Sequence, residues 1–404
     1  MSASSAQVSK KGLRKAVLAA VLFVIAIVAV VWGRGGLPGN VFGSGLRMGK
    51  TESVRVIIGS EKRGFLEDER VRDFMADRGY ELDIHTAGSR EIAQRPDLTE
   101  FEVVFPSSVA AAEKIEAVVG GAVVDKQRPF YSPMAIATFE PQLQALEAAG
   151  IASEEQGTWR IDMTRYVEEF QRGTRWRSLP TADVSYPSNQ KVMIRSTDIR
   201  TSNSAAMYLS IVSWVTNGGS IVNGQNQVTQ AVTDVAPFFL DQGGSGQSSA
   251  GPFAGYLSQG MSAYPMVMVY EAQFYGRLMG TEAGNQVSDS MRLAYPTPTV
   301  NSEHVALALT DRGADITRLL ADAPELQRIA AEHGFRTQDP SVFADVIAEK
   351  AAQSPPEFLD TTEVPDYDTL EQMIVGIERR YGFSSSPQRD PDGTGTDSLV
   401  SGGN

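Results

Sequence analysis

The chain has 404 residues, 42% of them hydrophobic and 21% charged, so it can build two or three packed units and is not generally disordered. It contains no cysteine, which excludes disulfides, thiolate nucleophiles, cysteine-ligated metals and a lipid-modified cysteine anchor. Five basic residues and no acidic one precede residue 35, and the other 31 basic and 49 acidic residues leave a balance of −18. A body this acidic repels phosphate backbones, so we expect no nucleic-acid partner.

The N-terminus has the pattern of a membrane anchor. Residues 1–15 are basic, and residues 16–32 form an uncharged apolar run that would span roughly 25 Å as a helix. We expect a single transmembrane helix over residues 16–33, a cytoplasmic N-terminus, a Gly-rich linker over 34–50 and an extracytoplasmic body. A cleaved signal peptide is the alternative, although no small-residue cleavage site follows the apolar run.

The first part of the body alternates short apolar runs with helical patterns. Helical spacing separates the apolar runs, and this alternation predicts parallel β-α-β units in an α/β fold with doubly wound sheets. The predicted strands are 54–58, 80–85 and 101–105, and the predicted helices are 67–78 and 110–115.

The pattern continues through the rest of the body. Two stretches rich in Gly, Ser, Asn and Gln, 218–227 and 242–251, are predicted loops. The tail, 383–404, has few apolar residues and is expected to be disordered. Further strands are predicted at 131–138, 191–195, 265–270, 291–295 and 304–309, and further helices at 141–149, 162–170, 202–215, 316–332, 342–352 and 369–381.

Polar side chains follow several of the predicted strands, where open α/β sheets bind their ligands. A helix N-terminus carries unpaired N–H groups and partial positive charge, so such ends could hold a small anion. The simpler reading is that Ser, Thr, Asn and Asp are preferred helix caps, that Lys62 is a solvated cation, and that Glu271 favours a helix start. The candidate ligand-binding residues are Ser60, Glu61, Lys62, Ser107, Ser108, Thr201, Ser202, Asn203, Tyr270 and Glu271.

Catalytic and metal-binding patterns are missing from the sequence. The three histidines, His85, His304 and His333, have no spacing typical of a triad or a metal site. No nucleophile elbow, zinc-protease motif or phosphate loop occurs. We therefore expect no enzyme activity, no catalytic residue, no cofactor and no metal. A hydrolase that uses Glu271 or His304 remains the enzymatic alternative.

Five stretches carry a resemblance to a known family. They occur in the family's order and span about residues 52–340. The stretches are 57–62 (IIGSEK), 131–138 (YSPMAIAT), 201–207 (TSNSAAM), 264–271 (YPMVMVYE) and 327–336 (QRIAAEHGFR). The body resembles type II periplasmic solute-binding proteins of bacterial ABC importers. It is most similar to extracellular solute-binding domains of actinobacterial membrane proteins, and more distantly to molybdate and sulfate binders.

The resemblance implies two α/β lobes, with a ligand in the cleft between them. Lobe 1 would comprise residues 51–138 and, with the C-terminal helices, 303–382. Lobe 2 would comprise 139–302, with crossings near Thr138 and over 302–309. Positions of the oxyanion-binding relatives carry over to Ser60, Ser107 or Ser108, Ser202 or Asn203, and Tyr270. The retained N-terminal helix and the unmatched residues 342–381 depart from the family.

Two functions follow from these patterns. The first is a membrane-anchored solute-binding protein that captures a small molecule, with an oxyanion as one candidate, for the permease of an ABC-type importer. The second is a membrane-anchored sensor or scaffold that uses the same fold to contact envelope proteins. The retained helix and the C-terminal extension favour the second function.

Overall fold

The structure is a computed structural model that describes residues 51–180, 188–243, 250–281, 286–351 and 354–381. The predicted anchor, linker and tail lie outside these residues. Within the described ranges, none of the helices combines the length and the apolar character that a membrane span requires.

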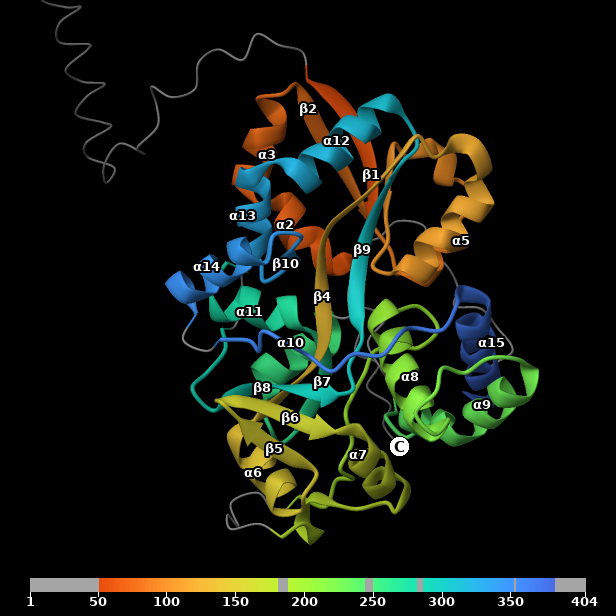
Figure 1. Ribbon diagram of the computed structural model, residues 1–404, viewed down its shortest axis with the longest axis vertical. Coiled ribbons are helices and arrows are strands. Elements are labelled where there is room, and N and C mark those ends of the chain that lie inside the picture. Colours follow the sequence, from red (N-terminus) through yellow and green to blue (C-terminus); the bar gives the residue numbers. More distant parts are fainter. Residues whose placement is uncertain (1–50, 181–187, 244–249, 282–285, 352–353, 382–404) are drawn as a thin grey trace, which may run out of the picture. The chain divides into compact units, whose positions relative to one another are not determined.

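The first sheet begins with three parallel strands. β1 (Glu52–Ile58) lies between β2 (Tyr80–Thr86) and β3 (Val103–Phe105) and pairs with both in parallel (Figure 1). The expected β-α-β units are therefore present in this part of the chain. The connecting helices are α2 (Arg63–Glu67), α3 (Glu69–Ala76) and α4 (Ser89–Ala93), and α5 (Val109–Val119) follows β3.

A long strand, β4 (Asp125–Phe139), joins the first sheet to a second one. Up to Pro133 it pairs antiparallel with β9 (Asn301–Ala308), which in turn pairs antiparallel with β3. From Met134 onward it pairs antiparallel with β7 (Met266–Tyr270), and its last residues also pair with β8 (Met291–Thr297). The sheets are therefore mixed: the predicted parallel units form β1, β2 and β3, and the strands that pass between the sheets run antiparallel to their neighbours.

The second sheet ends in a hairpin that the sequence analysis did not predict. β5 (Ala152–Glu155) and β6 (Thr158–Asp162) pair antiparallel, and β6 runs parallel to β8. The two turn residues, Gln156 and Gly157, have φ values of 51° and 78°, which suits the turn of a tight hairpin.

Three other predictions differ from the structure. The predicted strand at 191–195 forms only isolated bridges, one of them between Arg195 and Val267. The predicted helix at 316–332 is two helices, α12 (Asp311–Asp322) and α13 (Pro324–Glu332), because Pro324 has no N–H to continue the first one. Helices occupy part of both predicted loops: α9 (Gln225–Leu240) and α10 (Ala250–Gln259).

The remaining elements cover the sheets or extend them. Short 3-10 segments are Ser60–Lys62, Leu98–Glu100, Gly120–Ala122, Trp176–Ser178 and Arg379–Tyr381. The other elements are α6 (Glu140–Ala148), α7 (Met163–Gln171), α8 (Asn203–Thr216), α11 (Glu271–Leu278), β10 (Arg336–Thr337), α14 (Pro340–Lys350) and α15 (Tyr367–Glu378).

Both faces of each sheet are buried. In β1, Val56 and Ile58 belong to one hydrophobic cluster, whereas Ile57 belongs to another on the opposite face. In β4, Ile136 and Ala137 are divided between two further clusters in the same way. Because successive side chains of a strand point to opposite faces, this division explains why the second halves of β1 and β4 are continuously apolar, whereas β2 and β6 alternate in burial.

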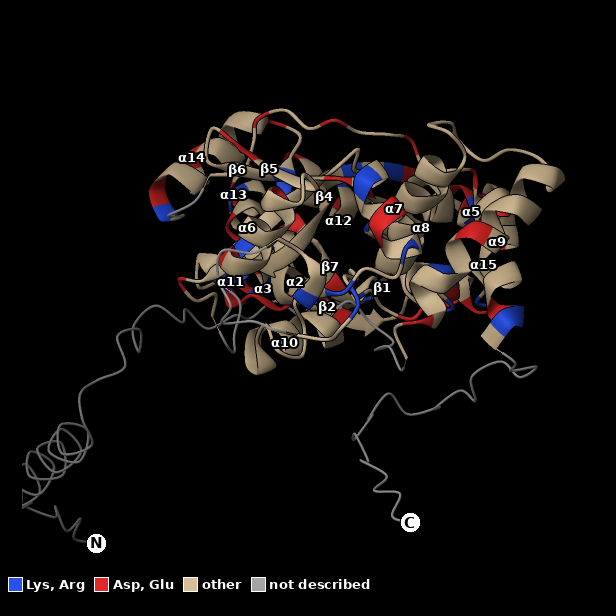
Figure 2. Ribbon diagram, turned by 90° about the horizontal axis from the view of Figure 1, so that it is seen from below, with Lys and Arg blue, Asp and Glu red and all other residues tan. Residues whose placement is uncertain are grey.

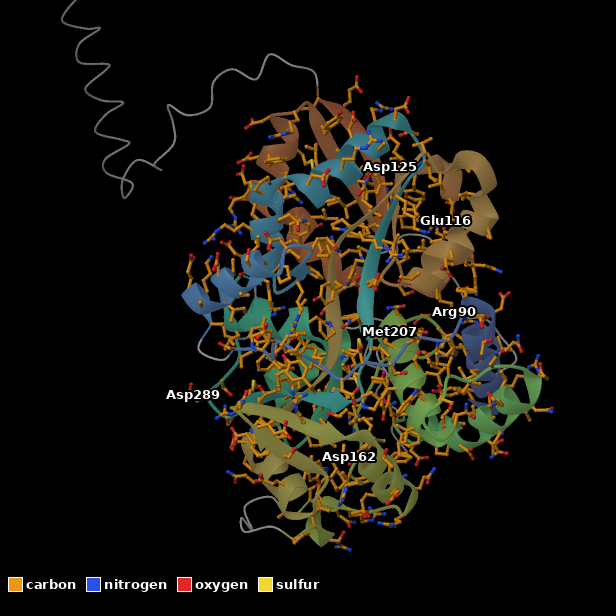
Figure 3. The ribbon with its side chains drawn as sticks, viewed as in Figure 1. Arg90, Glu116, Asp125, Asp162, Met207 and Asp289 are labelled. Atoms are coloured by element: carbon orange, nitrogen blue, oxygen red, sulfur yellow. The ribbon has the colours of Figure 1, made fainter. Side chains whose placement is uncertain are left out.

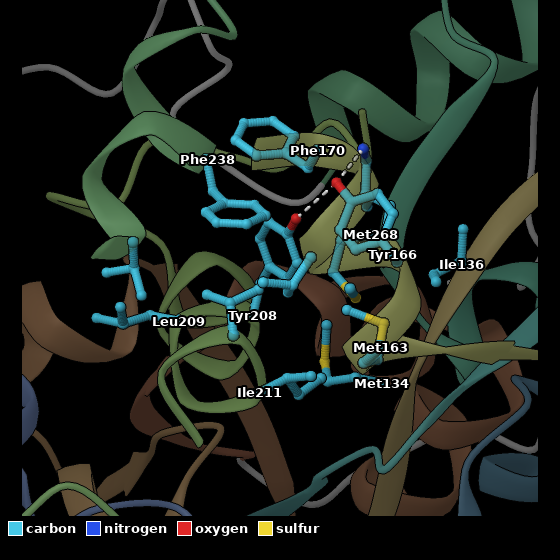
Figure 4. Close-up of a cluster of buried hydrophobic side chains, with 14 of the residues drawn as sticks. Met134, Ile136, Met163, Tyr166, Phe170, Tyr208, Leu209, Ile211, Phe238 and Met268 are labelled. Atoms are coloured by element: carbon cyan, nitrogen blue, oxygen red, sulfur yellow. Dashed lines mark hydrogen bonds between the residues drawn. The ribbon is translucent and has the colours of Figure 1, made fainter. Parts of the chain in front are cut away.

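The largest cluster packs α7, α8 and α9 against the second sheet (Figure 4). The rings of Phe170 and Phe238 stack with their centroids 3.9 Å apart. The Tyr166 hydroxyl lies 3.1 Å from that of Tyr208 and accepts a hydrogen bond from the Ile194 N–H at 2.9 Å. The polar atoms of these two buried tyrosines are thus satisfied, and the cluster fixes the position of α8.

Glu271 has a structural role, not the ligand-binding role expected of it. Its buried carboxylate accepts two hydrogen bonds from Arg336, from Nε at 2.7 Å and Nη2 at 2.8 Å, and one from the Tyr295 hydroxyl at 2.6 Å. These contacts tie α11 to β10 and β8. Most other ion pairs are more exposed, and Figure 2 shows acidic and basic residues interspersed along the elements.

We expect Arg336→Met to lower the free energy of unfolding by about 3–5 kcal/mol, because it leaves the Glu271 carboxylate buried without its partner. Urea denaturation checks this. Arg128→Met removes an exposed ion pair in which Arg128 Nη1 and Glu303 Oε2 lie 2.8 Å apart. This variant should lower the free energy of unfolding by only about 0–1 kcal/mol. Equal losses in the two variants would contradict the structural role of the Glu271 pair.

Candidate ligand-binding site

A cavity of about 180 Å³ lies where strand ends of the first sheet meet the start of α8 and the end of β7. Because β1, β2 and β3 are parallel, their carboxyl ends share one edge of the sheet, and the segments that follow them form one wall. The lining residues are Gly59, Ser60, Glu61, Thr86, Ala87, Gly88, Ser89, Glu91, Ser107, Thr201, Ser202, Asn203 and Tyr270.

Two glycines allow the backbone to pack closely at this edge. A Cβ on Gly59 would lie 2.2 Å from Ser107 Oγ, and a Cβ on Gly88 would lie 1.9 Å from the carbonyl oxygen of Thr201. Gly88 follows β2 of the first sheet, whereas Thr201 precedes α8. Direct backbone contact between the two walls at this point therefore requires glycine at residue 88.

Asn203 connects the two walls by hydrogen bonds. It is the first residue of α8, and its buried amide group donates to the Ser107 carbonyl at 3.2 Å and to the Tyr270 hydroxyl at 3.0 Å. The Ser107 carbonyl also accepts from the Ser302 hydroxyl, and the Ser107 N–H donates to Ser89 Oγ at 2.9 Å. The end of β3 is thus fixed to α8, β9 and α4.

A buried ion pair lies behind one wall. The Lys62 ammonium group is fully buried and lies 2.5 Å from Glu61 Oε1, 2.9 Å from Ser107 Oγ and 3.1 Å from His304 Nδ1. An ammonium group has three N–H donors, so this geometry uses each of them once. With Lys62 as the donor, His304 Nδ1 is the acceptor and the ring proton is assigned to Nε2, which has no hydrogen-bond partner among the described residues.

These contacts fix the charge states of the group. Burial raises the pKa of Glu61, but the Lys62 ammonium group and the hydrogen bond from Ser107 outweigh that effect and lower it to about 2, so Glu61 is ionised. Burial lowers the pKa of His304 well below its ordinary value, and Lys62 lowers it further, so the ring is neutral. Burial also lowers the pKa of Lys62, while Glu61 opposes the shift. The cavity therefore has an ionised carboxylate in its wall.

The hydrogen-bond donors of the cavity are not those expected from the sequence. The Ser107 hydroxyl donates to Glu61 and accepts from Lys62, so its proton does not face a ligand. Ser202 is the N-cap of α8, but its side chain makes no capping bond with the helix. The N–H groups of this first turn are the partial positive charge in the lining, which contains no Lys or Arg.

Seven of the ten predicted site residues line the cavity, and three do not. Lys62 lies behind the wall, because its ammonium group pairs with Glu61. Ser108 caps α5 by accepting from the Ala111 N–H at 3.3 Å, which is the simpler reading given above. Glu271 pairs with Arg336. The seven lining residues are Ser60, Glu61, Ser107, Thr201, Ser202, Asn203 and Tyr270.

The segment after β2 was missed. Thr86, Gly88, Ser89 and Glu91 line the cavity, and all lie at or just after the end of a correctly predicted strand. The rule that selected the ends of the other strands would have selected this one as well. Among the described residues, no cluster of His, Asp or Glu has the makeup of a metal site.

No family model and no curated protein sequence matches this chain. The ferric binding protein from Campylobacter jejuni superposes with a TM-score of 0.50 at 9% identity, over 81% of this chain and 97% of that one. A substrate binding protein of an ABC transporter from Agrobacterium tumefaciens also superposes with a TM-score of 0.50, at 12% identity, over 82% of this chain and 94% of that one. The sulfate-binding protein from Mycobacterium tuberculosis superposes with a TM-score of 0.46 at 15% identity, over 76% of this chain and 94% of that one.

The two structures with a TM-score of 0.50 are a ferric binding protein and the substrate binding protein of an ABC transporter. Both are covered almost completely by this chain. The identities are low, so the comparison establishes the fold. The body of this chain therefore has the mixed α/β fold of the type II solute-binding proteins, as its sequence resemblance implies.

Proposed function

We propose that this chain is an extracytoplasmic solute-binding protein that captures a small polar solute for an ABC-type importer and is held at the membrane by residues 16–33. The observation that carries the proposal is the single cavity to which strand ends of the first sheet, the start of α8 and the end of β7 all contribute. Asn203 donates a hydrogen bond to Ser107 in the opposite wall and another to Tyr270 beside it. The proposal assigns no catalytic step to these residues.

The size of the cavity favours a small ligand. Its volume of about 180 Å³ is more than ten times the roughly 10–15 Å³ that one water molecule needs. It is smaller than the pockets of about 300–1,000 Å³ that hold drug-sized molecules. A compact ion or a solute of a few heavy atoms fits this range, whereas a peptide or an oligosaccharide does not.

The charges in the lining favour a ligand that donates a hydrogen bond. The Glu61 carboxylate in the wall repels a fully ionised ligand and can accept a hydrogen bond from one that keeps an acidic proton, although Lys62 behind the wall offsets part of the repulsion. A helix N-terminus supplies only about 0.3–2 kcal/mol of attraction to an anion. An oxyanion that keeps an acidic proton can direct that proton to Glu61, so hydrogen phosphate suits the cavity better than sulfate.

The C-terminal extension favours a second candidate, a membrane-anchored sensor or scaffold. The helices α14 and α15 lie in the stretch that the sequence resemblance left unmatched. Co-purification of the full-length chain from membranes distinguishes the two functions. Recovery of an importer permease supports solute delivery, whereas recovery of another envelope protein supports the sensor.

We expect phosphate to raise the melting temperature of the full-length chain at pH 7.5, because binding to the folded state adds about 2.7 kcal/mol at 100 times the dissociation constant. Asn203→Ala should weaken this response, since it removes the bonds that join the two walls. Asn217→Ala, at the exposed end of the same helix, is the matched control. A panel of anions, amino acids and polyols that leaves the melting temperature unchanged would exclude solute capture.

Glu61→Gln should reverse the preference between two anions of similar shape. The amide carries no charge and can donate a hydrogen bond, so sulfate should bind at least as well as phosphate to this variant. Isothermal titration of both anions at one ionic strength measures the ratio of the two affinities. A ratio that is the same in wild type and variant would show that Glu61 does not select the ligand.

The pKa of Glu61 also predicts how stability depends on pH. The folded pKa of about 2 lies below the ordinary 4.5, so the ionised carboxylate contributes stability above pH 4.5, and this contribution is lost as the pH falls from 4.5 through 2. The difference in unfolding free energy between wild type and Glu61→Gln should shrink over that window. Urea denaturation at pH 2 to 6 tests this, and a constant difference would contradict it.

A further inference from the structure

The C-terminal helix α15 packs with the helices of the second sheet. Its Gly376 lies against α9, where an added Cβ would come within 2.7 Å of Val232 Cγ2. Such close packing makes α15 an integral part of the α8 and α9 layer. The apolar residues that α15 contributes to the cluster around these helices are Leu370, Met373, Ile374 and Ile377.

The polar face of α15 reaches the first sheet through Arg90 of α4. Arg90 donates to both carboxylate oxygens of Glu371, from Nε at 2.7 Å and Nη2 at 2.5 Å, and Glu378 lies 3.8 Å away. The Arg90 side chain is only 16% exposed, and Figure 3 places it beside α15. A bidentate, largely buried pair of this kind is stronger and better defined than an exposed ion pair.

Arg90 also contacts the opposite wall of the cavity. Its Nη1 donates to the Arg200 carbonyl at 2.5 Å, and Arg200 directly precedes the lining residue Thr201. Arg90 itself lies between Ser89 and Glu91, which line the first wall. The guanidinium group of a residue in the first wall therefore contacts both α15 and the backbone beside the second wall.

The segment that leads into α15 is fixed where the chain returns from the second sheet to the first. Thr299, between β8 and β9, donates its N–H to the Asp360 carbonyl at 2.9 Å. Its own carbonyl accepts from the Thr362 N–H at 2.8 Å. Residues 354–366 are thus bonded to the connection between β8 and β9, about which the two sheets would move. They lead directly into α15, which contacts Arg90.

We propose that α15 is a latch that holds the two cavity walls together through Arg90. Proteins of this kind close by hinge motion, and contacts made only in the closed form shift the balance between open and closed populations. The Arg90 contacts to Glu371 and to Arg200 span the two walls and touch no lining side chain. This inference depends on the proposed function in one respect only, namely that closure of the two walls encloses a solute.

The absence of cysteine allows a direct test with the full-length chain, because two introduced cysteines are then the only labelling sites. Spin labels at Glu81→Cys on β2 and Glu154→Cys on β5, both exposed, report the distance between the sheets by double electron–electron resonance. We expect Glu371→Gln to raise the ratio of open to closed molecules roughly tenfold, seen as a longer-distance population.

Asp368→Asn is the matched control. It removes the same charge from the same helix, but Asp368 is 77% exposed and lies 3.6 Å from Lys114, so the distances should not change. Arg90→Lys keeps the charge but loses the bidentate geometry, and it replaces Glu371→Gln should that variant fail to fold. Distances that match wild type in the folded variants overturn the latch, whatever the solute screen shows, because the measurement needs no ligand.

Discussion

The candidate site depends on the ion pair and hydrogen bonds made by the buried ammonium group of Lys62. It lies just after β1 and bonds to Glu61, to Ser107 after β3 and to His304 on β9, so it fixes three strands of the first sheet where the cavity wall forms. A buried charge is stable only when it is paired and fully hydrogen-bonded, and here each N–H has an acceptor. The same contacts keep Glu61 ionised and take the proton of Ser107 away from the ligand.

The consequence for function is a cavity that lacks a formal positive charge. Its lining has carboxylates, hydroxyl groups, one amide and the first turn of α8. Such a set recognises a ligand by matching donors to acceptors more than by neutralising its charge. Under the proposed function, a protonated oxyanion or another small polar solute would meet this requirement better than a fully ionised dianion.

The proposed closure and the proposed capture rest on different residues. Glu61, Asn203 and Tyr270 face the cavity, whereas Arg90 and Glu371 hold the walls from outside it. The long strand β4 connects the two sheets, and residues 354–366 are bonded to the return connection at Thr299. The C-terminal region is therefore placed to influence closure without contributing to the lining.

The sequence by itself determined many of the local elements and seven of the residues that line the cavity. Apolar runs and strand ends located β1, β3 and β7, and the polar residues after them include Ser60, Ser107 and Asn203. These features depend on short-range patterns, namely side-chain periodicity and the preference of polar residues for helix starts. The membrane anchor and the lobe boundaries stay predictions.

Tertiary structure alone decided which polar groups line the cavity and which bond to each other. Lys62 and Glu271, like Glu61, follow the end of a predicted strand. Neither lines the cavity, because each pairs with a buried partner. For Glu271 that partner is Arg336, which is 65 residues away. The strand directions of the second sheet and the contact of Arg90 with Glu371 also depend on distant segments. Pairing of this kind depends on which segments come together in three dimensions, and no local pattern in one sequence encodes it.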